Sequence, residues 1–248
     1  DYSVWELWGA LNYGGKVVMV PYVVSRSPEQ FYQLLVDEQV TVLSQTPSSF
    51  KQLQFVDEQR GDDAQTLSLR YVLVGGEAVD LPGFRSWFDR HGTTDPEIYI
   101  VYGITETTVF ITCRLLTFED TEPGTPNYIG TAIDDLSAHV LDEAMTPVAP
   151  GEVGELYVGG AGVGGGYLRR PELNREKFVP DPFGEKEGGI LYKTGDLVRL
   201  LEGDLEFIGR NDHQVQLRGF RVELGEIESV LNGLPGIRSA IVRAREDQ

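Results

Sequence analysis

Short apolar runs alternate with amphipathic stretches in the first half of the chain. Four of these runs predict buried strands, and they lie at residues 16–21, 40–43, 71–74 and 98–101. Apolar residues at helical spacing predict helices that begin at Ser27 and that cover residues 49–59 and about 81–91. Ser27 can cap its helix, Pro28 suits the first turn, and Gln30 completes a capping box. Strands that alternate with helices predict a mostly parallel sheet covered by helices.

The pattern changes after about Thr121. Short apolar runs at residues 139–141 and 155–158 are separated by turns rich in glycine and proline, which predicts a smaller antiparallel or barrel-like layer. Near the end, residues 224–232 predict a helix and residues 237–242 the next strand. The expected fold class is α/β: a helix-covered, mostly parallel sheet, then a small antiparallel or barrel-like β layer, then the beginning of a small α+β C-terminal subdomain.

The composition bounds the class of protein and its partners. The 248 residues are 41% hydrophobic and 24% charged, which is ordinary for a soluble globular protein. The formal net charge of -18 disfavours broad binding to nucleic acids or to anionic membranes. No apolar run approaches about 18 residues, so we expect no transmembrane helix, and no secretory leader is recognisable in this chain. The single cysteine, Cys113, excludes an internal disulfide, fits a cytoplasmic location and is expected to serve packing.

Three motifs combine glycine with polar residues, several of them charged, in a fixed order. The densest is Gly-Arg-Asn-Asp-His-Gln-Val-Gln-Leu-Arg-Gly-Phe-Arg-Val-Glu-Leu-Gly-Glu-Ile-Glu at residues 209–228, which favours a moving joint beside an anionic ligand over a purely structural element. Tyr-Lys-Thr-Gly-Asp lies at residues 192–196, and Tyr-Gly-Ile-Thr-Glu-Thr-Thr at residues 102–108. Together they predict a nucleotide site. The glycine-dense segment 154–167, in contrast, favours tight turns within a small barrel.

Two of the predicted strands end in polar, glycine-bearing loops, which is where ligands usually bind to a parallel sheet. Gly-Gly-Glu-Ala at residues 75–78 follows one strand, and the loop that begins at Tyr102 follows another. Tyr102 offers a face for stacking, Thr105 a hydroxyl for phosphate, and Glu106 a hard oxygen for Mg²⁺. Asp196 lies in an expected glycine-bearing turn at residues 194–196, where its carboxylate can accept both hydroxyls of a ribose. For each loop taken alone, an ordinary polar turn is the alternative.

The order of these motifs resembles that of the adenylate-forming enzymes. Asp-x-x-x-Trp at the start is followed by Tyr-Gly-x-Thr-Glu, Gly-Glu-Leu, Tyr-Lys-Thr-Gly-Asp and Gly-Arg-x-Asp-x-Gln-Val, along essentially the whole chain. Among those enzymes, the chain is most similar to an amino-acid adenylation domain of a nonribosomal peptide synthetase. The likeness covers only part of that domain, because the family's upstream phosphate loop and its C-terminal catalytic lysine have no candidate here. The resemblance therefore implies that this chain alone is inactive.

The resemblance implies a two-step, ATP-dependent ligase reaction. A carboxylate attacks the α-phosphorus of ATP to give an acyl-AMP and pyrophosphate, and the acyl group then passes to the phosphopantetheine thiol of a carrier-protein domain. This chemistry requires charge neutralisation and in-line placement. The metal is implied to be Mg²⁺ held by Glu106. The catalytic residues that the resemblance implies are Thr105, Glu106, Arg210 and Asp212.

The resemblance also implies a nucleotide-binding set. It consists of Gly76, Glu77, Ala78, Tyr102, Thr105, Asp196 and Arg210. In this set Tyr102 stacks on adenine, Asp196 binds the ribose, and Arg210 lies beside ribose and phosphate. One position departs from the family, because Ile100 stands where an asparagine usually bonds the adenine amino group. Either backbone groups alone read adenine, or the affinity for nucleotide is reduced.

Asp212 matches the hinge about which the family's small subdomain swings between the two half-reactions. Residues 1–211 are then the C-terminal half of the large subdomain, and residues 212–248 are the hinge and the start of the small one. The implied partners are an amino-acid substrate, a carrier domain and, in some family members, a small MbtH-like activator protein, for which residues after Arg26 are a candidate surface. Some members also carry a methyltransferase insertion soon after the Gly-Glu-Ile-Glu motif, so an interruption beyond residue 248 stays open.

The resemblance further implies a substrate pocket. Asp1 matches the acidic residue that pairs with the substrate's α-ammonium group, since a buried carboxylate needs such a partner. The other implied pocket residues are Tyr2, Trp5, Ser44, Leu73, Gly75, Val101, Val109 and Phe110. They are mostly apolar, with hydroxyls at Ser44 and Tyr2, so a neutral amino acid of small to medium size is expected. Threonine-like and branched aliphatic side chains both stay open, because one methylene changes binding by only about 1–3 kcal/mol.

Two other functions stay open. The first is an acyl-CoA or aryl-acid ligase of the same superfamily, which Asp1 and the Gln-Val-Gln-Leu-Arg-Gly wording at residues 214–219 disfavour. The second is a non-catalytic, truncated remnant that binds nucleotide or a partner without turnover. Exchange of pyrophosphate into ATP by the longer polypeptide, with amino acids compared with fatty acids, distinguishes the ligases.

Overall fold

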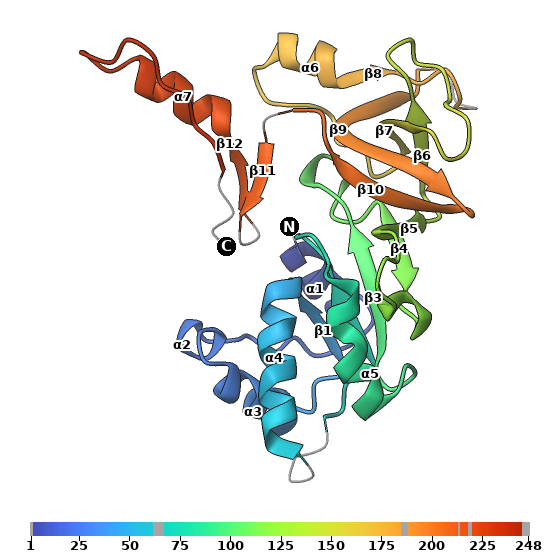
Figure 1. The fold of residues 1–248 in the computed structure, drawn as a ribbon, viewed down its shortest axis with the longest axis vertical. Coiled ribbons are helices and arrows are strands. Elements are labelled where there is room, and N and C mark those ends of the chain that lie inside the picture. Colours follow the sequence, from blue (N-terminus) through green and yellow to red (C-terminus); the bar gives the residue numbers. More distant parts are fainter. Residues whose placement is uncertain (1, 62–66, 185–187, 213, 218–219, 245–248) are drawn as a thin grey trace.

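A computed structural model describes residues 2–61, 67–184, 188–212, 214–217 and 220–244 (Figure 1). The first elements are α1 (Tyr2–Leu11), α2 (Tyr22–Ser25), α3 (Pro28–Asp37), β1 (Val42–Gln45), α4 (Pro47–Arg60), β2 (Tyr71–Val74), the 3-10 helix η2 (Leu81–Phe84), α5 (Arg85–His91) and β3 (Glu97–Tyr102). They are followed by η3 (Thr105–Thr107), β4 (Thr112–Leu115), η4 (Glu119–Thr121), β5 (Tyr128–Ala132), β6 (Leu136–Leu141), β7 (Val153–Gly160), α6 (Pro171–Lys177), β8 (Phe178–Pro180), β9 (Ile190–Leu201), β10 (Asp204–Arg210), β11 (Gln214–Leu217), β12 (Phe220–Glu223) and α7 (Leu224–Asn232). In this described part of the chain, no helix has both the length and the apolar character of a membrane span.

One mixed sheet joins the two parts of the fold. Within the described residues, ten strands form it in the order β1-β2-β3-β4-β5-β10-β9-β7-β6, with β8 paired to β9. β1, β2 and β3 are parallel, and the later pairs in this sheet are antiparallel. β5 bonds to both β4 and β10, so the helix-covered part continues directly into the antiparallel layer, which lies above it in Figure 1. The predicted α/β class, with its change of architecture midway, is confirmed.

Helices α3, α4 and α5 pack on one face of the parallel strands. Val72 and Ile100 on this face are 0% and 1% exposed, and they share a core with Trp87 of α5. Strand side chains alternate between the two faces of a sheet. Leu73 and Val101 therefore point to the opposite face, where they are available to line a site.

A buried carboxylate ties these three helices together. Asp57 of α4 is 1% exposed, and it accepts a hydrogen bond from the Tyr32 hydroxyl of α3 at 3.2 Å. From α5, Arg90 Nη2 lies 2.9 Å and His91 Nε2 lies 2.6 Å from Asp57 Oδ2. A buried charge is tolerated only when it is paired and hydrogen-bonded, and Asp57 has partners from both neighbouring helices.

Several local predictions are confirmed. The Ser27 side chain accepts a hydrogen bond from the Gln30 amide at 3.4 Å, and Pro28 is the first residue of α3. β2 and α7 begin and end at the predicted residues, 71–74 and 224–232. Each of these signals is local, because caps and buried apolar runs act on the residues beside them.

Two predicted strands are wrong. Residues 16–21 lie in no helix or strand of the described chain, and Met19 is 78% exposed. Residues 237–242 form no strand either, because side chains of α7 bond this segment: the Val242 amide donates to Glu228 Oε1 at 2.9 Å. A strand is defined by its partner's ladder of hydrogen bonds, which the apolar run alone does not supply. The prediction also missed α1.

β11 and β12 form a separate two-stranded antiparallel sheet. Figure 1 shows this hairpin and α7, coloured orange to red, beside the antiparallel layer rather than within it. The chain leaves β10 at Arg210 and reaches β11 at Gln214. The short connection between them includes Asp212, the predicted hinge residue.

Candidate functional site

Four predicted site residues from three segments of the chain meet in one hydrogen-bonded cluster. Tyr102, at the end of β3, donates its hydroxyl hydrogen bond to Asp196 of β9. Arg210, at the end of β10, donates from Nη1 to Asp196 Oδ1 at 2.5 Å. The same guanidinium binds Asp212 through two bonds, Nε to Oδ1 at 2.7 Å and Nη2 to Oδ2 at 2.6 Å. We call Tyr102, Asp196, Arg210 and Asp212 the Arg210 cluster.

Opposite charges dominate the electrostatics of this cluster. Burial acts to lower the pKa of Arg210, but the hydrogen bond to Asp212 and the charges of Asp196 and Asp212 raise that pKa above its usual value. Burial acts in the opposite sense on Asp212, whose pKa is nevertheless lowered by the hydrogen bond and the charge of Arg210. The ion pair is therefore charged on both sides at neutral pH, and the geometry is the bidentate one that favours arginine over lysine.

Asp196 lies in a strand and not in the turn that its Gly-Asp sequence predicted. Gly195 has a φ of +80°, a conformation that favours glycine. A Cβ on Gly195 would lie 2.7 Å from Asp212 Oδ2 and 2.8 Å from Arg210 Nη2. The glycine thus bends β9 where Asp196 enters the cluster, and it leaves room for the arginine.

Asp196 is only 2% exposed, and both of its carboxylate oxygens are already engaged. Oδ2 accepts from Tyr102, and Oδ1 accepts from Arg210. A ligand hydroxyl that binds Asp196 must share these bonds or displace one of them. Binding at this carboxylate is for that reason coupled to the position of Arg210.

Further bonds that the sequence did not predict hold the cluster in place. The Thr194 carbonyl accepts from Arg210 Nη2 at 3.1 Å. Glu155 of β7 bridges the two sides, since its Oε1 accepts from the Gly195 amide at 3.0 Å and its Oε2 accepts from Asn211 Nδ2 at 2.9 Å. Glu155 belongs to the Gly-Glu-Leu motif, so the motif was visible in the sequence, but its target 40 residues later was not.

Glu106 lies in η3, directly after the β3 loop. The Tyr167 hydroxyl donates to Glu106 Oε1 at 2.5 Å and lies 2.9 Å from the Tyr192 hydroxyl. Burial raises the pKa of Tyr167, and its hydrogen bonds to Glu106 and Tyr192 raise it further, so this phenol is a protonated donor. Thr105, beside Glu106, is exposed at the surface.

The Glu106 carboxylate fits the predicted magnesium site. Among the described residues, no group of three or more His, Cys, Asp or Glu side chains is placed to hold a metal ion by itself. Mg²⁺, however, is usually held by one or two carboxylates together with substrate phosphates and water. The half-buried Glu106 carboxylate, beside the loop that follows β3, is a donor of that kind.

The loop after β2 contains three predicted nucleotide-binding residues, Gly76, Glu77 and Ala78. Gly76 has a φ of +82°, and Ala78 is exposed. The side chain of Glu77 is turned to the start of α4, where its Oε2 accepts from the Ser48 amide at 3.2 Å. A carboxylate at the first turn of a helix is favoured by the helix dipole. Of the three predicted nucleotide residues here, Glu77 thus already has a structural partner.

Predicted substrate residues gather on the face of the parallel strands that lies opposite α3, α4 and α5. Tyr2 and Trp5 of α1 meet Phe110 edge to face, with ring centroids 5.4 Å and 5.7 Å apart. A Cβ on Gly75 would lie 2.1 Å from the Val101 carbonyl oxygen and 2.7 Å from the Tyr2 hydroxyl. The position therefore has to be glycine for Tyr2 to reach this point.

The remaining pocket positions follow from the register. Ser44 of β1 lies beside Leu73 of β2, and Leu73 is 8% exposed. Val109 is 8% exposed and has a φ of +73°, an unusual conformation for a β-branched residue, in the loop that leads to Phe110. Asp1, the predicted ammonium-binding residue, lies outside the described residues.

The Tyr2 hydroxyl is a buried polar group without a hydrogen-bond partner among the described residues. Burial raises the pKa of Tyr2, and the charges of Glu6 and Glu77 raise it further, so the group is a neutral phenol. An unsatisfied buried hydroxyl costs about 1–3 kcal/mol. A ligand that forms a hydrogen bond with the Tyr2 hydroxyl recovers part of this unfavourable free energy.

Ile100, the position that departs from the family, has no place in this site. It is 1% exposed and packs in the core beneath the helices. It therefore presents no polar group to a base, and both expectations for this position, recognition of adenine by backbone groups alone or a reduced affinity for nucleotide, stay predictions.

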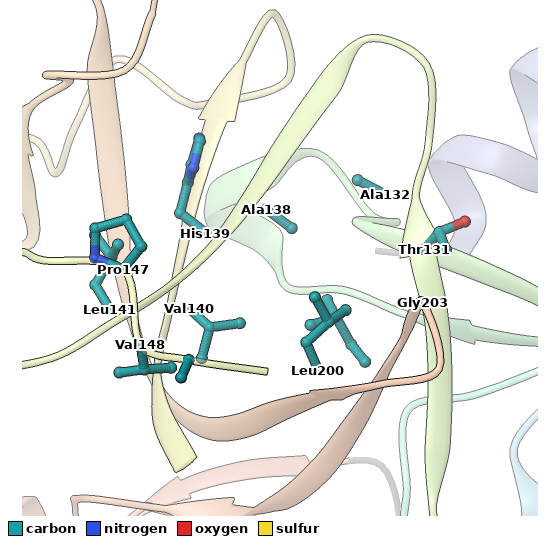
Figure 2. Close-up of a pocket in the computed structure, with 12 residues that line it drawn as sticks. Thr131, Ala132, Ala138, His139, Val140, Leu141, Pro147, Val148, Leu200 and Gly203 are labelled. Carbon is teal, nitrogen blue, oxygen red and sulfur yellow. The ribbon is translucent and has the colours of Figure 1, made fainter. Parts of the chain in front are cut away.

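A separate cavity of about 320 Å³ opens in the antiparallel layer. Figure 2 shows side chains from its walls, which are mostly apolar. The cavity is lined by Thr131, Ala132, Ala138, His139, Val140, Leu141, Pro147, Val148, Ala149, Leu200, Gly203 and Leu205. None of these was predicted as a site residue. None of them belongs to the Arg210 cluster either, so the cavity and the cluster are distinct features.

Comparisons with known proteins agree with the motifs. Residues 1–168 match the protein family described as "AMP-binding enzyme". A dimodular nonribosomal peptide synthase from Bacillus subtilis (strain 168) is 51% identical over 249 residues, which cover 100% of this chain and 10% of that protein. Syringomycin synthase SyrB1 from Pseudomonas syringae pv. syringae is 46% identical over 244 residues, which cover 98% of this chain and 38% of that protein.

Solved structures show the same similarity. PA1221, described as a nonribosomal peptide synthetase protein containing adenylation and PCP domains, superposes with a TM-score of 0.84 at 32% identity. The match covers 100% of this chain and 48% of that one. The chain thus spans less than half the length of each of these relatives.

Proposed function

The chain belongs to the AMP-binding enzyme family, in which it corresponds to part of a nonribosomal peptide synthetase adenylation domain, and we propose that the longer polypeptide activates an α-amino acid. The amino-acid carboxylate attacks the α-phosphorus of ATP, the bond from that phosphorus to the pyrophosphate oxygen breaks, and aminoacyl-AMP and pyrophosphate result. A carrier thiol then attacks the acyl carbon, and AMP leaves. The observation that carries this proposal is the Arg210 cluster, in which residues of three separate motifs share one set of hydrogen bonds.

In this proposal each member of the cluster has one task. Tyr102 stacks on the adenine, Asp196 accepts the ribose hydroxyls, and Arg210 stabilises negative charge that develops at the phosphate. Thr105 is at the surface of the same loop, and its hydroxyl is the proposed contact to a phosphate oxygen. Glu106 would hold a Mg²⁺ ion, which supplies charge neutralisation to the phosphates when it is bound.

Asp212 is the proposed hinge between residues 1–211 and 212–248. It follows the last strand of the large sheet and precedes the separate β11–β12 hairpin. The carrier domain is the proposed acceptor partner, which is consistent with the PCP domain in the description of PA1221. An MbtH-like activator stays a proposal with no contact to support it.

The pocket favours a neutral side chain with a hydroxyl. The predicted pocket residues that the structure describes are largely apolar, and the buried Tyr2 hydroxyl has no hydrogen-bond partner among the described residues. A site built to hydrogen-bond a substrate discriminates against an analogue that lacks the group. Of the two side-chain classes that the sequence left open, the threonine-like class is therefore the proposed one.

Replacing Tyr2 with phenylalanine tests this choice. Tyr2→Phe in the full-length polypeptide is expected to reduce the preference for threonine over its isostere valine by roughly two- to tenfold, because one neutral hydrogen bond contributes roughly 0.5–1.5 kcal/mol and 1.4 kcal/mol is a factor of ten. The ratio of kcat/KM values in pyrophosphate exchange measures it. Tyr13→Phe is the matched control, since Tyr13 is 89% exposed. An unchanged ratio in Tyr2→Phe would count against the hydroxyl-bearing substrate.

The reaction itself is tested by exchange of labelled pyrophosphate into ATP. The full-length polypeptide is expected to catalyse exchange with one or a few neutral amino acids and not with fatty or aryl acids. Exchange with fatty or aryl acids alone would identify the superfamily's other ligases, and no exchange with any acid would favour a remnant without turnover. We expect no exchange from the 248-residue chain alone, because it spans less than half of its relatives.

A further inference from the structure

Residues 161–167, the part of the glycine-dense segment that follows β7, lie across the loop that carries Glu106. The Gly164 amide donates to the Glu106 carbonyl at 2.8 Å, and the Thr108 hydroxyl donates to the Gly162 carbonyl at 2.7 Å. A Cβ on Gly162 would lie 2.9 Å from the Thr107 carbonyl oxygen. Backbone thus packs directly on backbone, which only glycine permits at this distance. The glycines serve this contact as well as the turns that the sequence predicted.

Tyr167 ends this segment and is held by several independent contacts. Its amide donates to Asn174 Oδ1 at 2.6 Å, and its carbonyl accepts from Asn174 Nδ2 at 2.9 Å. Its ring meets Phe178 edge to face at 5.6 Å. With backbone and ring both fixed, the Tyr167 hydroxyl has little freedom when it donates to Glu106.

Tyr192 completes the arrangement from β9. It is 0% exposed, and its hydroxyl lies 2.9 Å from that of Tyr167. A tyrosine hydroxyl carries one proton. Because the Tyr167 hydroxyl donates its one hydrogen bond to the Glu106 carboxylate, its oxygen accepts the hydrogen bond from the Tyr192 hydroxyl. The order of donation is therefore Tyr192 to Tyr167 to Glu106.

We propose that Tyr167, backed by Tyr192, is a positioning residue that fixes the orientation of the Glu106 carboxylate towards a divalent cation bound with the nucleotide. This inference rests on the proposed function. Outer hydrogen bonds of this kind orient metal-binding carboxylates, and their loss typically costs about 10–100-fold in metal affinity. The glycine segment contributes by holding the η3 backbone, so that the carboxylate is fixed at both ends.

The test uses the full-length polypeptide with Tyr167→Phe and Tyr192→Phe. Tyr157→Phe is the matched control, because Tyr157 on β7 is 4% exposed and its hydroxyl pairs with Lys193 instead. Two readouts are taken: the Mg²⁺ concentration that gives half-maximal exchange, and the calorimetric affinity for a non-hydrolysable ATP analogue with and without Mg²⁺. The second readout needs no turnover.

Tyr167→Phe is expected to raise the Mg²⁺ midpoint and to weaken magnesium-dependent analogue binding, each by about tenfold. The amino-acid KM and the analogue affinity without Mg²⁺ are expected to stay at wild-type values. Tyr192→Phe is expected to act in the same direction with a smaller effect, and Tyr157→Phe to change neither readout.

The outcomes separate this inference from the proposed function. If the wild type catalyses no exchange but Tyr167→Phe still weakens magnesium-dependent binding, the positioning role stands and the proposed reaction falls. Equal magnesium dependence in wild type and Tyr167→Phe overturns the positioning role, whatever the exchange activity. A general loss of activity and melting temperature without a change in magnesium dependence also overturns it, as does a wild type that binds the analogue without any effect of Mg²⁺.

Discussion

Arg210→Ala is expected to lower the rate of amino-acid-dependent pyrophosphate exchange at least about 100-fold. The variant removes the group proposed to stabilise phosphate charge, and the loss of one such donor typically costs about 10²–10³ in kcat. It also leaves Asp196 and Asp212 without their cation, and Asp196 is 2% exposed. Removing one partner of a buried ion pair is strongly destabilising, because the other charge stays uncompensated.

Arg199→Ala is the matched control for this prediction. Arg199 lies in β9, three residues after Asp196, and pairs with Glu206 on β10, outside the cluster. Its side chain is 37% exposed, but Glu206 is only 8% exposed, so Arg199→Ala also leaves a buried carboxylate without its cation and matches that loss of charge outside the cluster. Wild-type activity in Arg199→Ala is expected. Near-wild-type exchange in Arg210→Ala, with the fold intact by circular dichroism, would show that the cluster is only structural.

Arg210→Lys separates charge from geometry at the same position. Lysine keeps the positive charge, but its single ammonium group cannot reproduce the bidentate contact with Asp212 or reach Asp196 at the same time. An intermediate loss of about tenfold is expected if the shared geometry matters, because one planar group then links Asp196, the proposed ribose-binding residue, to Asp212, the proposed hinge. Full activity in Arg210→Lys would mean that charge alone suffices.

The sequence correctly predicted features whose contacts lie within a few residues of one another. The Ser27 cap, the apolar run of β2 and the stripe of α7 are complete within a few residues, and each was predicted with its bounds or its capping contact. The motif order, through the resemblance to the adenylate-forming enzymes, predicted which segments converge: Tyr102 ends the parallel strand β3, whereas Asp196 and Arg210 pair across the antiparallel strands β9 and β10. Tyr102, Asp196, Arg210 and Asp212 do meet.

Features that depend on partners distant in sequence were not predicted. Residues 16–21 have the composition of a strand, but a strand also needs a neighbour, and the apolar pattern says nothing about its presence. Asp196 was expected in a turn because Gly195 precedes it, whereas the glycine serves the approach of Arg210 from another strand. Tyr167 went unnoticed for the same reason, since its partner Glu106 is 61 residues away.

Asp57→Asn is expected to lower the local stability of the helix layer by about 3 kcal/mol. Asparagine keeps the shape but not the charge, so Arg90 and His91 lose their common carboxylate while Tyr32 loses a charged acceptor. The estimate is at the low end of the range for a buried pair, because the Arg90 and His91 side chains are each 26% exposed and keep some solvent.

Native-state amide hydrogen exchange on the full-length polypeptide measures this loss, since it reports each segment separately and does not require that a multidomain chain unfold in one step. Protection in α4 and α5 is expected to fall roughly 100-fold, because 1.4 kcal/mol corresponds to a factor of ten. Asp89→Asn is the matched control: Asp89 lies on α5 with a side chain that is 60% exposed, and its pair with Arg85 is a surface one. Protection in β9 and β10 is expected to stay unchanged in Asp57→Asn, because these strands have a separate core. Equal loss across both cores would mean that Asp57 supports the whole sheet and not the three helices alone.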